Sequence, residues 1–192
     1  MPNWCANTVT IKGPVDQIRA IWDDAHADKD GGLLQALRPM PAALQDTVKG
    51  TGDEAQTQTH DGFTNWYDWA VSQWGTKWDI DIEYLNYDEH NDGTASITGG
   101  ADSAWSPPIE AFQAYANENP DVYLELKYFE PGMSFIGIWD SEGGDAYWED
   151  IYGLVKSKAD EEDTVLAELF EEFNVWECYD WEDEEIVDAA AE

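Results

Sequence analysis

The sequence predicts an α+β fold with an antiparallel sheet. Segments in which apolar and polar residues alternate, as in strands, are separated by stretches with helical periodicity. Their order is strand, helix, strand, strand, helix, strand, which is the split βαββαβ order of ferredoxin-like folds. We expect helices on one face of this sheet, with an extra hairpin strand, a loop and helix insertion, and an acidic helical C-terminal module.

The first strand and helix are predicted at 3–12 and 14–27. Small and β-branched side chains alternate through the first segment, and Gly13-Pro14 ends it. Proline suits the first turn of a helix. The carboxylate of Asp16, also in the first turn, interacts favourably with the positive end of the helix dipole. The apolar residues recur at helical spacing: Ile18, Ile21, Trp22 and Ala25.

An insertion is predicted at about 30–78. Its apolar residues at 33–40 indicate a short turn or helix, whereas the Gly-, Thr- and Gln-rich stretch 47–62 is typical of an exposed loop. Helical periodicity returns at 65–74, and Gly75 is placed to end that helix. The two indoles of Trp74 and Trp78 are expected to pack in or beside the core.

The remaining strands of the sheet are predicted from alternation and turn residues. Asn91-Asp92-Gly93 is a hairpin signal. Ser106 is placed to cap the second helix, which precedes Asn117. The strands are expected at 79–87, 94–105, 122–128 and 133–139.

We predict a domain of 1–144 and an acidic C-terminal module of 145–192 packed on it. Residues 160–192 hold fifteen carboxylates and no Lys or Arg, yet apolar residues recur among them. This pattern favours a folded and docked segment over a free acidic tail. Helices are predicted at 148–156 and 163–173, and a short strand at 174–179.

The charge of the chain is extreme and uneven. The net charge is −33, of which residues 79–192 carry −29, from three basic and thirty-two acidic groups. Nucleic acid and anionic membranes would repel such a chain, so we expect neither as a direct partner. No apolar run approaches the length of a membrane span, and the N-terminus does not resemble a signal peptide, which predicts a cytoplasmic protein. We expect Cys5 and Cys178 to be reduced there.

No residue pattern indicates catalysis. His26, His60 and His90 are isolated, and no nucleophile or phosphate-binding motif is present. Asp88 to Gly93 resembles the start of a calcium loop, but the third and twelfth positions, His90 and Gly99, do not fit it. We therefore expect no enzyme activity, no metal and no cofactor.

Several separated motifs follow one another along the chain: Met1 to Asn7, Pro39 to Pro41, Tyr67 to Trp69, Trp74 to Trp78, and Ser103 to Pro108. In their residues and in their order they resemble the YubB-type ferredoxin-like domain family of phage and conjugative-plasmid proteins. The resemblance covers about residues 1–140 and implies the fold and a mobile-element origin. Because the family has no assigned activity, the resemblance implies no active site.

The functional hypothesis is a DNA mimic that blocks a basic nucleic-acid-binding host protein, such as a restriction, CRISPR or other defence nuclease. Alternate residues of a strand lie about 6.6 Å apart on one face, which is comparable to the spacing of phosphates along a DNA strand. We expect one negative surface from the following carboxylates: Asp79, Asp81, Glu83, Asp160, Glu161, Glu162, Asp163, Glu168, Glu171, Glu172, Asp180, Glu182, Asp183, Glu184 and Glu185.

Two other hypotheses stay open. The acidity could be an adaptation to high salt. Such an adaptation should also place many acidic residues in 1–78, yet the net charge of that segment is only −4. A Trp-rich pocket could instead sequester or hydrolyse a nucleotide signal, although an electronegative surface disfavours anionic ligands.

Overall fold

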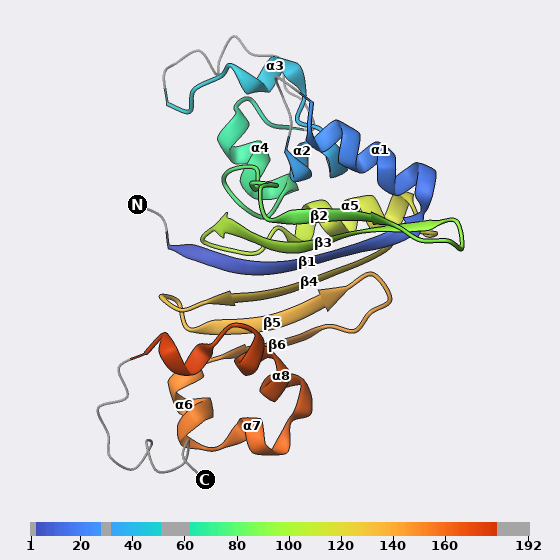
Figure 1. Cartoon of the computed structure of the whole chain (residues 1–192). Coiled ribbons are helices and arrows are strands. Elements are labelled where there is room, and N and C mark those ends of the chain that lie inside the picture. Colours follow the sequence, from blue (N-terminus) through green and yellow to red (C-terminus); the bar gives the residue numbers. More distant parts are fainter. Residues whose placement is uncertain (1–2, 28–31, 51–61, 180–192) are drawn as a thin grey trace.

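The computed structural model describes residues 3–27, 32–50 and 62–179 (Figure 1), with the side chain of Glu161 left out. This part of the chain forms a six-stranded antiparallel sheet in the order β2-β3-β1-β4-β5-β6. The predicted α+β class is confirmed. The strands are β1 Trp4–Pro14, β2 Leu85–Glu89, β3 Thr94–Ala104, β4 Tyr123–Glu130, β5 Phe135–Asp140 and β6 Ala146–Glu149.

The helices fall into two groups along the chain. The first group lies before and between the central strands: α1 Val15–Ala25, α2 Leu33–Leu37, α3 Ala42–Gln45, α4 Trp66–Gln73 and α5 Ile109–Glu118. The second group follows β6: α6 Ile151–Lys156, α7 Ala159–Glu162, α8 Thr164–Glu172 and the 3-10 turn η2 Val175–Glu177. Figure 1 shows α1 to α4 gathered near β2 and β3, and α6 to α8 near β6, at the other end of the sheet.

β1 is the central strand. It pairs with β3 from Trp4↔Ala104 to Pro14↔Thr94, and with β4 from Ala6↔Phe129 to Lys12↔Tyr123. The alternation in the sequence therefore separates two faces of the sheet. Val9 and Ile11 are fully buried on the face that we name the first face. Thr8 and Thr10 lie on the opposite, second face.

Each face of the sheet has its own hydrophobic core. On the first face, residues of β1, β3 and β4 pack with α1, α2, α4 and α5 in a cluster that includes Ile18 and Phe112. On the second face, Phe129 of β4 and its register partner Ile136 of β5 pack with α6 and α8. The second group of helices is thus docked on the sheet by a separate core, which we name the second cluster.

Three predicted elements differ from the structure. Residues 79–84 are irregular, and the strand predicted at 79–87 begins only at Leu85. The segment 146–149 is a strand, because Trp148 pairs with Ile136, and the helix predicted at 148–156 begins at Ile151. The strand predicted at 174–179 is wrong, because Asn174 takes a left-handed conformation (φ 48°) and the 3-10 turn η2 follows.

Gly75 ends α4 as predicted. Its φ is +84°, a value that glycine adopts without a steric penalty. A Cβ there would also lie 3.1 Å from the carbonyl oxygen of Pro107. The chain therefore turns away from α4 at this position, and Trp74 is 5% exposed whereas Trp78 is 39% exposed. The expectation of core or core-edge packing is confirmed for Trp74, and Trp78 is more exposed than that.

Three of the separated sequence motifs are joined by buried hydrogen bonds. The side-chain amide of Asn7 donates to the carbonyl of Ala101 (3.0 Å) and to Ser103 Oγ (2.9 Å). The hydroxyl of Thr76 donates to the carbonyl of Ala104 at 2.9 Å and accepts the Ala104 N–H at 3.0 Å. These contacts tie β1, β3 and the turn after α4 together, so these motif residues have a structural role.

Candidate functional site: an acidic surface beside α8

α8 presents carboxylates from a firmly docked helix. Its apolar stripe of Leu166, Leu169 and Phe170 is at most 1% exposed within the second cluster. Asp163 caps its N-terminus by accepting the N–H groups of Val165 (3.0 Å) and Leu166 (3.2 Å). Glu168, Glu171 and Glu172 are exposed at i, i+3 and i+4, and so lie on neighbouring turns of one side.

The neighbouring strand extends this charged area. Lys127 of β4 lies on the second face, and its ammonium group is 2.8 Å from a carboxylate oxygen of Glu172. Partial burial lowers the pKa of Lys127, but Glu172, Glu125 and Glu168 outweigh that effect and raise it above its usual value. Three carboxylates thus act on Lys127, and Glu171 lies beside two of them on α8. We name Glu125, Glu168, Glu171 and Glu172 the α8 acidic surface.

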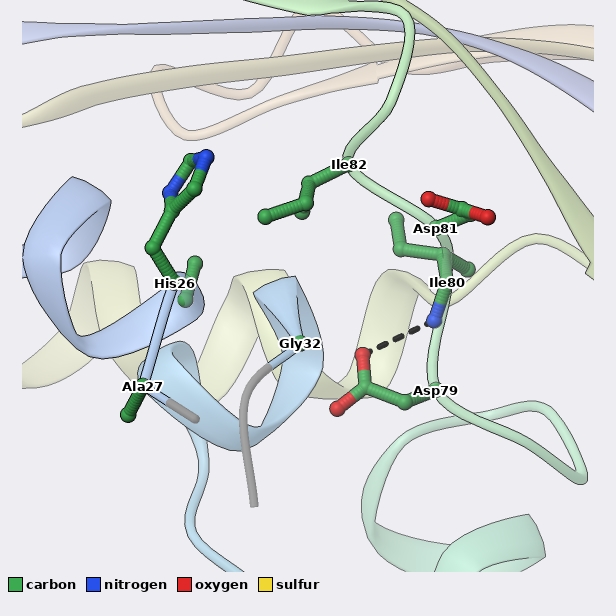
Figure 2. A pocket seen from close by; sticks show the side chains of 8 residues that line it. His26, Ala27, Gly32, Asp79, Ile80, Asp81 and Ile82 are labelled. Carbon is green, nitrogen blue, oxygen red and sulfur yellow. Dashed lines mark hydrogen bonds between the residues drawn. The ribbon is translucent and has the colours of Figure 1, made fainter. Parts of the chain in front are cut away.

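Asp79 does not belong to this surface. It lines a pocket of about 490 Å³ together with His26, Gly32 and Asp81, and Figure 2 shows these residues. Its carboxylate accepts the backbone N–H groups of Leu34 (2.7 Å), Gln35 (2.9 Å) and Ile80 (2.8 Å). It therefore fixes the start of α2 against the chain before β2. A Cβ at Gly32 would lie 2.3 Å from an oxygen of this carboxylate, so a larger residue there would displace the Asp79 side chain.

Replacing Asp79 by Asn tests this role through its pH dependence. Burial raises the pKa of Asp79, although the three N–H donors act in the opposite direction. The stability that a raised pKa contributes is fully present below the usual Asp pKa of about 3.9 and is lost as the pH rises through the folded value. An amide nitrogen cannot accept the Gln35 N–H, so Asp79→Asn should cost about 1–2 kcal/mol at acid pH, and less at neutral pH. Denaturant unfolding at both pH values, with the exposed Asp46→Asn as control, measures this; a cost that grows with pH would contradict it.

The other predicted carboxylates divide by position. Asp81 and Glu83 are exposed, and Asp81 accepts the Glu83 N–H in the irregular segment. Asp160 is half-buried and Glu162 is exposed, both in α7, where Glu161 also lies. The last five lie outside the described residues: Asp180, Glu182, Asp183, Glu184 and Glu185.

The expectation that Asp79 and Asp81 share one surface with the C-terminal helices is wrong. Both line a pocket formed with the end of α1 and the start of α2, whose helices pack on the first face. α8 packs on the second face, near β6 in Figure 1. The sheet therefore lies between Asp79 and Asp81 on one side and the carboxylates of α8 on the other, because the strand predicted to carry Asp79 and Asp81 does not form.

Sequence reasoning missed Glu125, although a signal for it was present. Leu124 and Leu126 are fully buried on the first face, so the alternation turns Glu125 to the second face, where it pairs in register with Thr10. Which charged helix would lie beside it could not be read from the strand itself.

Among the described residues, no group of three His, Cys, Asp or Glu side chains could hold a metal ion. The described helices include none that is both long and apolar enough to cross a membrane.

Comparisons with known proteins gave a match to a solved structure and none to a family model or a curated protein. Among solved structures this chain is similar to protein api92 from Yersinia pseudotuberculosis, described under the family model DUF1281. The two share 13% sequence identity, the match covers 78% of this chain and 98% of that chain, and the TM-score is 0.40. A likeness at this level assigns neither a family nor a function.

Proposed function

We propose that this protein is a DNA mimic with an anti-defence role, encoded by a phage or plasmid, which binds and blocks a basic nucleic-acid-binding host protein. The observation that carries the proposal is the α8 acidic surface: three exposed carboxylates on a helix whose other side is buried in the second cluster, beside the half-buried Glu125 of β4. Fixed carboxylates at short spacing can engage Lys and Arg as phosphates do. Counterion release and long-range steering then favour binding.

The distribution of charge supports a directed surface. The described cation nearest to the surface, Lys127, already pairs with Glu172. Glu168 and Glu171 form no salt bridge with a described residue. Such carboxylates repel each other and destabilise the compact state, an effect that a cationic partner would relieve.

The finer fold and origin are part of the proposal. The order β2-β3-β1-β4, with α1 between β1 and β2 and α5 between β3 and β4, supports a ferredoxin-like unit extended by β5 and β6. The sequence motifs, and not the structural comparison, support a remote relation to the YubB-type family. We place the boundary between domain and acidic module at about residue 145.

The proposal is tested by capture and displacement. The immobilised chain is exposed to a bacterial lysate at low salt, and bound proteins are eluted with a short DNA duplex or with buffer alone. We expect DNA-binding proteins that the duplex releases selectively, and binding that weakens steeply as salt rises. Binding that is unchanged by salt would contradict mimicry, and a chain that melts at low temperature unless molar KCl is present would favour salt adaptation instead.

A further inference from the structure

A second site lies on the first face, where the sheet extends beyond α5. A pocket of about 410 Å³ opens there between that helix and β4, β5 and β6. We propose that this pocket, which we name the aromatic pocket, binds the guanidinium group of an arginine side chain of the protein partner. The residues that carry the proposal are Gln113, Tyr128, Trp139, Asp145 and Tyr147.

The walls of the pocket are aromatic and fixed in place. Tyr128 and Trp139 are each 5% exposed. The Trp139 ring meets Phe112 of α5 edge-on, with centroids 6.3 Å apart, and Tyr128 meets Phe135 in the same way at 6.2 Å. Aromatic faces attract cations, and a planar guanidinium can stack on them.

Gly137 allows Tyr128 to reach the pocket. A Cβ at this position would lie 2.5 Å from the Tyr128 hydroxyl oxygen, so the hydroxyl lies across the glycine. Gly137 pairs in register with Tyr128 on one side and Tyr147 on the other. The two tyrosines therefore flank one glycine on the first face, where no side chain separates them.

The polar groups of the pocket are suited to accept hydrogen bonds. The Tyr128 hydroxyl makes no hydrogen bond to a described residue. Burial, with smaller contributions from Tyr147, Cys5 and Asp145, raises its pKa to about 12, so the hydroxyl stays neutral. Asp145 is exposed at the rim, and the Gln113 side-chain N–H₂ donates to Asn117, which leaves its carbonyl oxygen as an acceptor.

A guanidinium group matches this set of walls and acceptors. It offers five N–H donors in one plane and no acceptor, and it is less strongly hydrated than an ammonium group. No Lys or Arg is among the described residues that line the pocket, so no cationic side chain of the pocket neutralises the Asp145 carboxylate. An anionic ligand would instead meet Asp145.

Charge complementarity selects the source of the arginine. A chain of net charge −33 attracts basic proteins, and such proteins contact nucleic acid largely through Arg and Lys. In this respect the inference rests on the proposed function. The aromatic pocket would add a specific anchor to the attraction that the acidic surface supplies, as buried aromatic and arginine contacts do at other interfaces.

The test uses the full chain and two small probes, N-acetyl-arginine amide and its neutral isostere N-acetyl-citrulline amide. Binding is followed by NMR through the indole N–H signal of Trp139. We expect the arginine probe to shift this signal, and the citrulline probe to bind at least about tenfold more weakly. Asp145→Asn should weaken arginine binding about fivefold, and Tyr128→Phe, which keeps the ring, about threefold. The control Asp102→Asn, an exposed carboxylate on the second face, should change nothing.

Equal binding of the two probes, or arginine binding that Asp145→Asn leaves unchanged, would overturn the inference. The outcome is separable from that of the proposed function. If the chain binds arginine but DNA displaces it from no captured protein, the pocket proposal is supported and mimicry is refuted. If DNA displaces the chain but the chain does not bind arginine, mimicry is supported and the pocket proposal is refuted.

Discussion

Replacing Phe170 by alanine is expected to cost about 3–5 kcal/mol of unfolding free energy and to release α6 and α8 from the sheet. Phe170 is 1% exposed, and its ring meets Trp176 edge-on with centroids 5.7 Å apart. The second cluster is small, and truncating Phe170 would leave a cavity in the core that α8 shares with Phe129 and Ile136 of the strands. A small core has few other contacts to compensate for this loss.

The two cores make the effect local. The hydrophobic core on the first face does not include Phe170 or its neighbours in α8, so β1 to β3 should keep their packing. Hydrogen exchange measured by mass spectrometry should therefore show lost protection in 151–172 and retained protection in 4–14 and 94–104. The matched control is Val165→Ala, since Val165 is 40% exposed on the same helix. Equal loss of protection in both regions would contradict two separate cores.

Neutralising Glu168 and Glu171 together to Gln is expected to weaken binding of a DNA-displaceable partner about tenfold or more at low salt. Each exposed carboxylate contributes up to about 1 kcal/mol to an ion pair, and salt screens this contribution. Both side chains are exposed, and neither forms a salt bridge with a described residue, so the double variant should keep its fold and melt at or slightly above the melting temperature of the parent. The loss would then reflect binding alone.

The matched control removes the same charge from the other side of the sheet. Asp23 and Asp24 are exposed in the last turn of α1, where a negative charge is unfavourable to the helix dipole. Asp23→Asn with Asp24→Asn should leave partner affinity within about twofold of the parent, since only distant charge is lost. Equal weakening by the two double variants would indicate general attraction by net charge rather than a surface at α8.

The central strands could be predicted from the sequence because their signals are local. The alternation in β1 and β3 and the helical periodicity of α1 and α5 arise from burial on one face, which neighbouring residues share. The same holds for α8, where the apolar stripe turns Glu168 and Glu171 outward. Their exposure was therefore readable before their surroundings were known.

The misplaced elements depend on contacts distant in the sequence. Residues 79–84 alternate as a strand would, yet Asp79 bonds to Leu34 across a separation of 45 residues, and this cap takes the segment out of the sheet. β6 is short, and it forms because β5 offers it an edge. The aromatic pocket likewise forms from residues of α5, β4, β5 and β6, which come together only when the chain folds. None of these encounters leaves a periodic signal in the sequence.

A competition titration tests the central claim most directly. A captured partner is mixed with labelled DNA duplex at fixed salt, and the full chain is added in increasing amounts. If the α8 acidic surface occupies the nucleic-acid site, DNA should be displaced completely, and the apparent dissociation constant of the chain should rise in proportion to the DNA concentration. A ternary complex in which the partner holds the duplex and the chain at once would contradict the account.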